Sequence, residues 1–304
     1  MQTTEENKSV GYGLFLAFIG VAVFSLTLPL TSALTDNLSY YDIGIGRSLI
    51  AAAGALIAFA LFGVGDKLPK GNQWFKLLIT SIGISYGFPI LTAVGMQSVP
   101  SSHGAIILGG LTLVTALFGA FLDKKRLSSA FLSVAILGFG VIVIFALVTN
   151  KGTDLSFYHG DIALVAAVIL AGLGYAQGGI LARDLGGWRV ICWTLIISLP
   201  VLISLGLFLV DIDNVLRLDS HSWVQFLVLG LFNSLIGFFF WFRGLALAGV
   251  SAASQVQLLQ PFLTYYVAVI FLGEQQDVVV LGFALLIVGI IALAQKILRS
   301  ERGG

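Results

Sequence analysis

Ten apolar segments divide this chain, and each is about as long as a helix that crosses a lipid bilayer. A crossing helix needs roughly 20 mostly apolar residues, and the charged residues fall almost entirely between the segments. Charged residues make up 10% of the chain, against about 25% in soluble domains. The sequence therefore predicts an all-α integral membrane protein with helices over residues 12–34, 41–63, 74–97, 101–122, 129–149, 161–182, 188–210, 223–246, 251–272 and 278–297.

The lysines and arginines indicate the orientation of these helices, because such residues accumulate on the cytoplasmic side of a membrane. With both termini placed in the cytoplasm, Lys151 and Arg217 are the cations expected outside, and Arg47 lies within the second segment. The other thirteen of the 16 cations then fall on the cytoplasmic side: Lys8, Lys67, Lys70, Lys76, Lys124, Lys125, Arg126, Arg183, Arg189, Arg243, Lys296, Arg299 and Arg302.

The two halves of the chain share matching residues at an offset near 150 residues. Five expected helices per half is an odd number, so the second half must enter the membrane from the opposite side, as in many secondary transporters. We therefore expect two inverted five-helix repeats, over residues 1–150 and 151–304. The alternative is that short apolar sequence matches recur by chance. The matched pairs are Gly87–Phe88 with Gly237–Phe238, Ser101 with Ser251, and Phe121–Leu122 with Phe271–Leu272.

Three further stretches carry a resemblance to a known family. Arg47 stands in IGRSLIAAAGAL, the segment Trp241–Leu247 reads WFRGLAL, and Pro261 lies in QLLQPFLTYYVAVIFLGE. With the ten-helix repeat, this pattern resembles the drug/metabolite transporter superfamily, specifically its EamA-type members. The first half departs from the family pattern, since Leu111 stands where proline is usual and Asp123–Lys124 replaces Gly-Glu.

The resemblance implies a function and a location. It implies export or facilitated passage of small organic metabolites, often amino acids, across a bacterial inner membrane. It also implies a central cavity lined mainly by the first, third, fourth, sixth, eighth and ninth helices. The expected partners are a small-molecule substrate and the lipid bilayer, and a homodimer is left open. A net charge of +1 indicates no nucleic-acid partner.

Polar and aromatic side chains inside the expected helices are the candidate substrate-binding residues, because polar groups are costly in a bilayer. Each of them has an alternative role, as a hydrogen bond or a packing contact between helices. In particular, Asn233, Gly237, Trp241 and Gly244 share one helical face, which suits either a cavity wall or close packing. The candidates are Ser25, Tyr86, Tyr175, Gln177, Asn233, Trp241, Gln257 and Gln260.

Ionisable residues narrow the substrate class. No Asp or Glu lies in the middle of an expected helix, which disfavours a pump for quaternary cations and favours neutral or zwitterionic substrates. Arg47 lies inside the second helix, where an arginine costs roughly 2.5–3.5 kcal/mol at the centre. It can receive a substrate carboxylate, pair with acids of the outer loops or cap backbone carbonyls. His103, at the start of the fourth helix, suits an interface position better than a proton-carrying role.

The motifs do not favour an enzyme. The sequence contains no nucleotide-phosphate loop, no metal-binding cluster and no Ser/His/Asp grouping at one depth. The glycine-rich stretch GLGYAQGG lies within an apolar span and follows no strand, so we interpret it as a site of close helix packing. We expect no cofactor and no metal. The leading hypothesis is a secondary transporter working by alternating access; the alternative is a membrane-embedded lipid-handling protein or enzyme.

Overall fold

The structure is a computed structural model that describes residues 2–65, 68–98, 107–149, 158–272 and 278–302. All regular secondary structure in these ranges is helical. We number the ten membrane-crossing segments helices 1 to 10. Eight are long apolar helices, a ninth is the shorter Ile107–Leu122, and another runs without a gap through α14, η3 and α15.

The first repeat contains helices 1 to 5. Helix 1 is α1 followed by α2, helix 3 is α4, η1 and α5, and helix 4 contains α7. The bounds are α1 Gln2–Phe24, α2 Thr27–Leu34, α3 Tyr40–Phe62, α4 Gln73–Ser81, η1 Ile82–Gly87, α5 Phe88–Met96, α7 Leu111–Leu122 and α8 Ser129–Thr149.

The second repeat contains helices 6 to 10. Helix 6 is the single helix α9, helix 8 is α12, η2 and α13, and α11 is a short helix between helices 7 and 8. The bounds are α9 His159–Leu185, α10 Gly187–Leu209, α11 Ile212–Leu216, α12 Ser220–Leu227, η2 Val228–Ile236, α13 Gly237–Ala248, α14 Val250–Ser254, η3 Gln255–Leu259, α15 Gln260–Leu272 and α16 Val278–Arg302.

The observed helices differ from the expected spans mainly at their ends and in their continuity. Helix 1 begins ten residues earlier than expected and is interrupted at Ser25–Leu26. Helix 8 is longer than expected at both ends, because Asp219 caps it and Gly249 ends it. His103, Glu274 and the expected repeat boundary at 150–151 lie outside the described residues.

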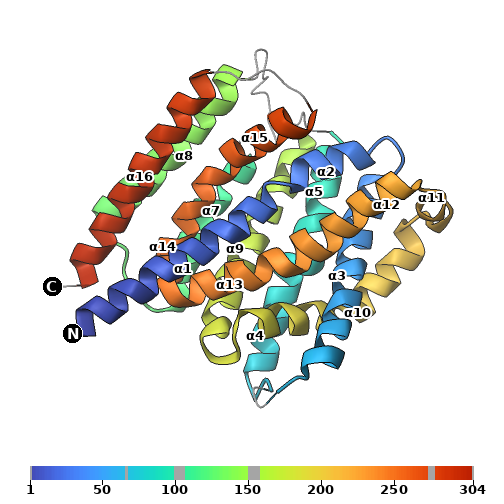
Figure 1. The fold of residues 1–304 in the computed structure, drawn as a ribbon, viewed down its shortest axis with the longest axis horizontal. Coiled ribbons are helices and arrows are strands. Elements are labelled where there is room, and N and C mark those ends of the chain that lie inside the picture. Colours follow the sequence, from blue (N-terminus) through green and yellow to red (C-terminus); the bar gives the residue numbers. More distant parts are fainter. Residues whose placement is uncertain (1, 66–67, 99–106, 150–157, 273–277, 303–304) are drawn as a thin grey trace.

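The contacts between helices follow the inverted repeat. Helix 1 packs on helix 8 through α1 and α13, and helix 6 packs on helix 3 through α9, α4, η1 and α5. Helix 2 packs on helix 8 as helix 7 packs on helix 3. The two second helices, α3 and α10, pack together along one edge, and the two fifth helices, α8 and α16, along the other (Figure 1).

Both ends of the chain lie on the same side of the bundle (Figure 1). We call this face the terminal side and the opposite face the distal side. An even number of crossings places the two ends together in this way. The terminal side therefore also holds the last turns of helices 2, 4, 6 and 8 and the first turns of helices 3, 7 and 9.

Capping fixes the distal ends of two helices. Ser39 and Asp42 form a capping box at the start of α3, with the Ser39 N–H donating to Asp42 Oδ2 over 2.8 Å. Asp42 Oδ1 accepts from the backbone N–H of Asp211, also over 2.8 Å, so both carboxylate oxygens are engaged. At α12, hydrogen bonds from Ser222 hold the pKa of Asp219 below its ordinary value.

Candidate functional site

The helices depart from regular α geometry in the interior of the bundle. Helix 3 contains a π-helical segment at Ile82–Gly87, and helix 8 contains one at Val228–Ile236. Helix 9 has a 3₁₀ segment at Gln255–Leu259, and helix 4 makes a tight turn in which the Gly110 N–H donates to Ile107 O over 3.0 Å. When the first repeat is shifted by 150 residues onto the second, the π-helical segments of helices 3 and 8 overlap. The tight turn of helix 4 likewise overlaps the 3₁₀ segment of helix 9. π-Bulges and broken helices are frequent at functional sites.

Helix 1 is interrupted where its backbone hydrogen bonds change, since the Leu26 N–H donates to Val23 O over 3.2 Å, three residues earlier. Pro29 has no N–H to offer the carbonyl of Ser25, four residues earlier. Thr264 Oγ1 of helix 9 donates to that carbonyl instead, over 3.1 Å. Asn233 Nδ2 of helix 8 donates to Val23 O over 3.0 Å and to Thr27 Oγ1 over 2.7 Å. Side chains from helices 8 and 9 therefore hold the interruption.

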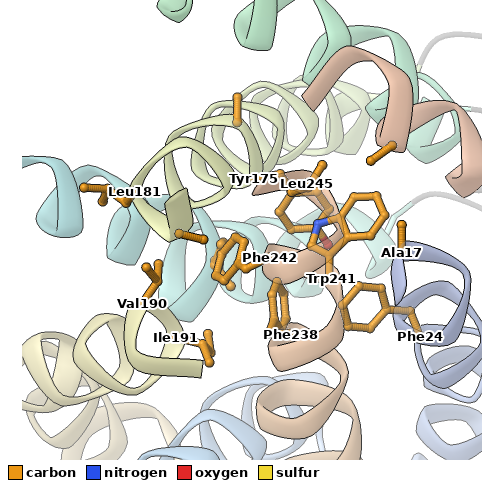
Figure 2. Close-up of a cluster of buried hydrophobic side chains, with 14 of the residues drawn as sticks. Ala17, Phe24, Tyr175, Leu181, Val190, Ile191, Phe238, Trp241, Phe242 and Leu245 are labelled. Carbon is orange, nitrogen blue, oxygen red and sulfur yellow. The ribbon is translucent and has the colours of Figure 1, made fainter. Parts of the chain in front are cut away.

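An aromatic cluster lies beside this interruption. Trp241 of α13 is fully buried and lies between Tyr175 of α9 and Phe24 of α1 (Figure 2). The ring centroids of Tyr175 and Trp241 are 5.6 Å apart, and those of Phe24 and Trp241 are 6.1 Å apart. Phe238 contacts Phe24 at 4.8 Å and Tyr175 at 5.7 Å. We call these four residues the aromatic cluster; helices 1, 6 and 8 meet in it.

The helix 8 face singled out in the sequence packs against helix 1. A Cβ at Gly244 would lie 2.6 Å from the backbone nitrogen of Ala17, and one at Gly237 would lie 2.9 Å from the Phe24 ring. Asn233 bonds helix 1 directly. Along this face the contacts are those of a packing surface, and Trp241 brings it into the aromatic cluster.

The glycine-rich stretch of helix 6 permits close approach on several sides, as predicted. A Cβ at Gly174 would lie 3.2 Å from Gly83 Cα in the π segment of helix 3. A Cβ at Gly172 would lie 2.6 Å from Val114 in helix 4, and one at Gly179 would lie 2.7 Å from Leu245 in helix 8. Tyr175 is held between these contacts, which fixes its position in the cluster.

Four of the eight predicted site residues fall into two groups. Tyr175 and Trp241 share the aromatic cluster, while Ser25 and Asn233 lie at the interruption of helix 1. No hydrogen bond or ring contact among the described residues joins the other four to these groups. Tyr86 lies in η1, Gln177 and Gln257 are buried, and Gln260 begins α15.

Several contributing residues were missing from the predicted set. Phe24 and Phe238 are aromatic residues in an aromatic-rich chain, so neither was distinctive. Phe238 does precede Trp241 by three residues, and this spacing on one helix face was an available signal. Thr27 and Thr264 stood near prolines, and their hydroxyls serve the interruption.

Some buried polar atoms have no hydrogen-bond partner within the part of the chain that the structure describes. They include Trp241 Nε1, Arg47 Nε, Ser85 Oγ and Gln257 Oε1. Buried polar groups are usually satisfied, so each such atom needs an explanation. Two of these four, Trp241 and Gln257, belong to the predicted set.

Polar side chains join helices 4, 6 and 9 toward the terminal side. The Arg183 guanidinium at the end of helix 6 binds the Asp123 carboxylate through two hydrogen bonds of 2.7 and 2.6 Å. Ser251 Oγ at the start of helix 9 donates to Ala116 O of helix 4 over 3.2 Å. A surface cavity of about 340 Å³ beside them is lined by Ser9, Lys125, Arg183 and residues 246–249.

These features define a class of protein. Ten apolar helices in two inverted repeats, with irregular helices around a polar and aromatic centre, are the architecture of a secondary membrane transporter. The comparison with protein families agrees. The EamA-like transporter family matches residues 11–147 and again residues 159–295, one match for each repeat. The chain belongs to this family, within the drug/metabolite transporter superfamily, and is a multi-pass integral membrane protein.

Similar proteins support the assignment. The chain is 35% identical over 287 residues to the Bacillus subtilis (strain 168) protein named "Uncharacterized transporter YdeK", covering 93% of this chain and 95% of that one. "Uncharacterized transporter YyaM" of the same organism is 22% identical over 288 residues, covering 90% and 93%. A solved crystal structure at 17% identity has the same fold, with a TM-score of 0.77 over 95% of this chain and 98% of that chain.

Proposed function

We propose that this transporter moves small neutral or zwitterionic metabolites, such as amino acids, by alternating access, as an exporter or a facilitator. The observation that carries the proposal is the pairing of irregular helices between the repeats. Helices 3 and 8 are both π-helical, and helices 4 and 9 both tighten, in the interior of the bundle. Inverted-repeat transporters place their substrate between such discontinuous helices.

The chemistry of this interior suits a neutral or zwitterionic solute. Among the described residues, the carboxylates lie at helix ends or in connecting segments, as Asp42 and Asp123 do. The aromatic cluster offers an apolar surface. Gln257 Oε1 and Trp241 Nε1 offer an acceptor and a donor that have no partners among the described residues. An amino acid or a similar metabolite matches this mixture.

Alternating access requires the terminal side to open. The contacts that must separate are those of helix 4 with helix 9 and of helix 6 with helix 8 near their terminal ends. The ion pair of the exposed Arg183 with the partly buried Asp123 is suited to this role, because it joins the terminal ends of helices 6 and 4. From the distribution of lysine and arginine we infer that the protein lies in a bacterial inner membrane with its terminal side facing the cytoplasm.

Counterflow into proteoliposomes, measured across a panel of amino acids, tests the function. We expect at least one amino acid to exchange. Trp241→Phe and Gln260→Ala should lower its rate, while Gln225→Ala, on α12 at the distal end, serves as the matched control. Wild-type protein that exchanges no solute, or that moves lipid between leaflets instead, would contradict the proposal. Wild-type rates in both site variants would remove the site assignment.

A further inference from the structure

Arg47 is a cation inside the membrane span whose Nε has no acceptor. It lies seven residues after Tyr40, the first residue of α3, which is about 10 Å along the helix axis. Its Nε atom is buried and has no hydrogen-bond partner among the described residues. A guanidinium carries five N–H donors and cannot be neutralised at ordinary pH, so an acceptor is required.

The neighbours of Arg47 on α3 show where its side chain points. Gly44 faces helix 3, since a Cβ there would lie 3.4 Å from Pro89 O, and Ile50 faces Gly230 of helix 8. Arg47 follows the first and precedes the second by three residues, so it points between them, about 60° from each. Ile45 and Leu49, on the opposite side of α3, face Gly206 of helix 7. Arg47 therefore points into the bundle.

The inward direction leads to the aromatic cluster. Arg47 interacts electrostatically with Tyr175 of helix 6, so both side chains face the same part of the bundle interior. Tyr175 in turn contacts Trp241, whose Nε1 is also buried without a partner among the described residues. Two side chains that interact with Tyr175 thus carry an unsatisfied group, and both groups are hydrogen-bond donors. What they lack is an acceptor.

The protein does not supply that acceptor within the described residues. The nearest acid on the same helix is Asp42, and both of its oxygens are taken by backbone N–H groups of Ser39 and Asp211. Arg47 makes no ion pair with a described residue. A structural arginine at this depth would be expected to have such a partner.

We propose that Arg47 binds the carboxylate of the transported solute, so that the solute is an organic acid or an amino acid with a free carboxylate. The proposal rests on the proposed transport function and narrows its substrate class. A carboxylate matches the planar guanidinium fork and accepts two parallel hydrogen bonds. The aromatic cluster would cover the apolar part of the solute.

A matched series of ligands tests the carboxylate. Leucine has a free carboxylate, isocaproate lacks only the amine, leucinamide lacks the negative charge and isoamylamine lacks the carboxylate altogether; phenylalanine gives a second series. Each is added to purified protein, and the shift in melting temperature and the counterflow rate are measured. In at least one of the two series, we expect the amino acid and its deaminated acid to shift the melting temperature of the wild-type protein. The corresponding amide and amine should leave that temperature unchanged.

Variants at Arg47 separate binding from structure. Arg47→Gln should weaken the response to the carboxylates at least about tenfold, and Arg47→Lys should fall between it and the wild type. Arg243→Gln, an exposed arginine on α13, is the matched control. Without ligand, Arg47→Gln should melt no lower than the wild type, because it removes an unsatisfied charge. A structural arginine would show the reverse.

The outcomes distinguish this inference from the transport function. A carboxylate shift that Arg47→Gln abolishes, without solute flux in the wild type, supports the binding site and contradicts transport. Flux that Arg47→Gln leaves unchanged, or equal shifts with the amides, supports transport and overturns the inference. Failure of every carboxylate in both series to shift the wild type also overturns it, as does a lower melting temperature of ligand-free Arg47→Gln.

Discussion

Helices 1 and 6 are the first helices of the two repeats, yet they are built differently. Helix 6 runs unbroken from His159 to Leu185, and 67% of its apolar window is buried, against 41% for helix 1. Helix 6 packs on helices 3, 4, 7, 8 and 9, whereas helix 1 is interrupted at Ser25–Leu26 and packs mainly on helix 8. Inverted repeats therefore do not impose equal roles. We interpret helix 6 as the fixed support and helix 1 as the part with a hinge.

The largest effect on stability is expected at Gly83, where helix 3 packs closely on helix 6. Gly83→Ala places a methyl group against the carbonyl oxygen of Leu170 in helix 6, and backbone on both sides resists a shift. We expect destabilisation at the upper end of about 1–3 kcal/mol, measured as a lower melting temperature. Gly140→Ala on helix 5 meets no atom within 4 Å and is the control. Equal melting temperatures would show that helix 6 is not tightly held.

The next effect concerns the side chain that spans the hinge. Asn233→Leu keeps the side-chain size but removes both hydrogen bonds to helix 1, and it leaves Val23 O without its Asn233 donor. We expect a loss of about 1–3 kcal/mol in thermal unfolding. Ser234→Ala is the control, because that hydroxyl bonds only within helix 8. A variant as stable as this control would mean that Asn233 does not hold the hinge.

At Pro29 we expect a smaller change in stability but a large change in the counterflow rate. Pro29→Ala restores an N–H that can bond Ser25 O, so helix 1 can become continuous like helix 6. We expect unfolding to change by less than about 1 kcal/mol, while counterflow slows severalfold. Pro200→Ala, within the unbroken helix α10, is the control. Equal rates in the two variants would argue against a hinge in helix 1.

The smallest effect on stability is expected at the terminal side, where the end of helix 6 is paired. Asp123→Asn breaks the pair with the exposed Arg183 and should cost at most about 1 kcal/mol, with a dependence on salt concentration. The rate of exchange should change more than the melting temperature does. Exchanging the two charges, as Asp123→Arg with Arg183→Asp, should restore the rate. If the exchange does not restore it, the pair is not a closing contact.

Much of this comparison was accessible from the sequence. The apolar segments and the repeat offset predicted ten helices in two inverted repeats. The prolines at 29, 89 and 261 lie near Ser25, Tyr86 and Gln260 and were an available signal for the irregular points there. The glycines of GLGYAQGG correctly predicted close packing. Each of these signals is local, since it depends on hydropathy, backbone donors or side-chain size.

Other features depend on contacts between distant segments. The π-helix of helix 8 contains no proline, and nothing within Val228–Ile236 distinguishes it from ordinary helix. The choice between cavity and packing for the Asn233 face needed its partner, helix 1, which lies more than 200 residues away. Arg47 left two roles open, because only the three-dimensional arrangement shows that Asp42 is already occupied.

The hinge in helix 1 is the central claim, and distances between spin labels test it most directly. In a Cys192→Ala background, labels at Asn37 and Val279 report the distal half of helix 1, and labels at Ile162 and Val279 report helix 6. Addition of a solute identified by counterflow should shift the first distance distribution and leave the second unchanged. Equal shifts in both pairs, or a shift in the helix 6 pair alone, would contradict the account.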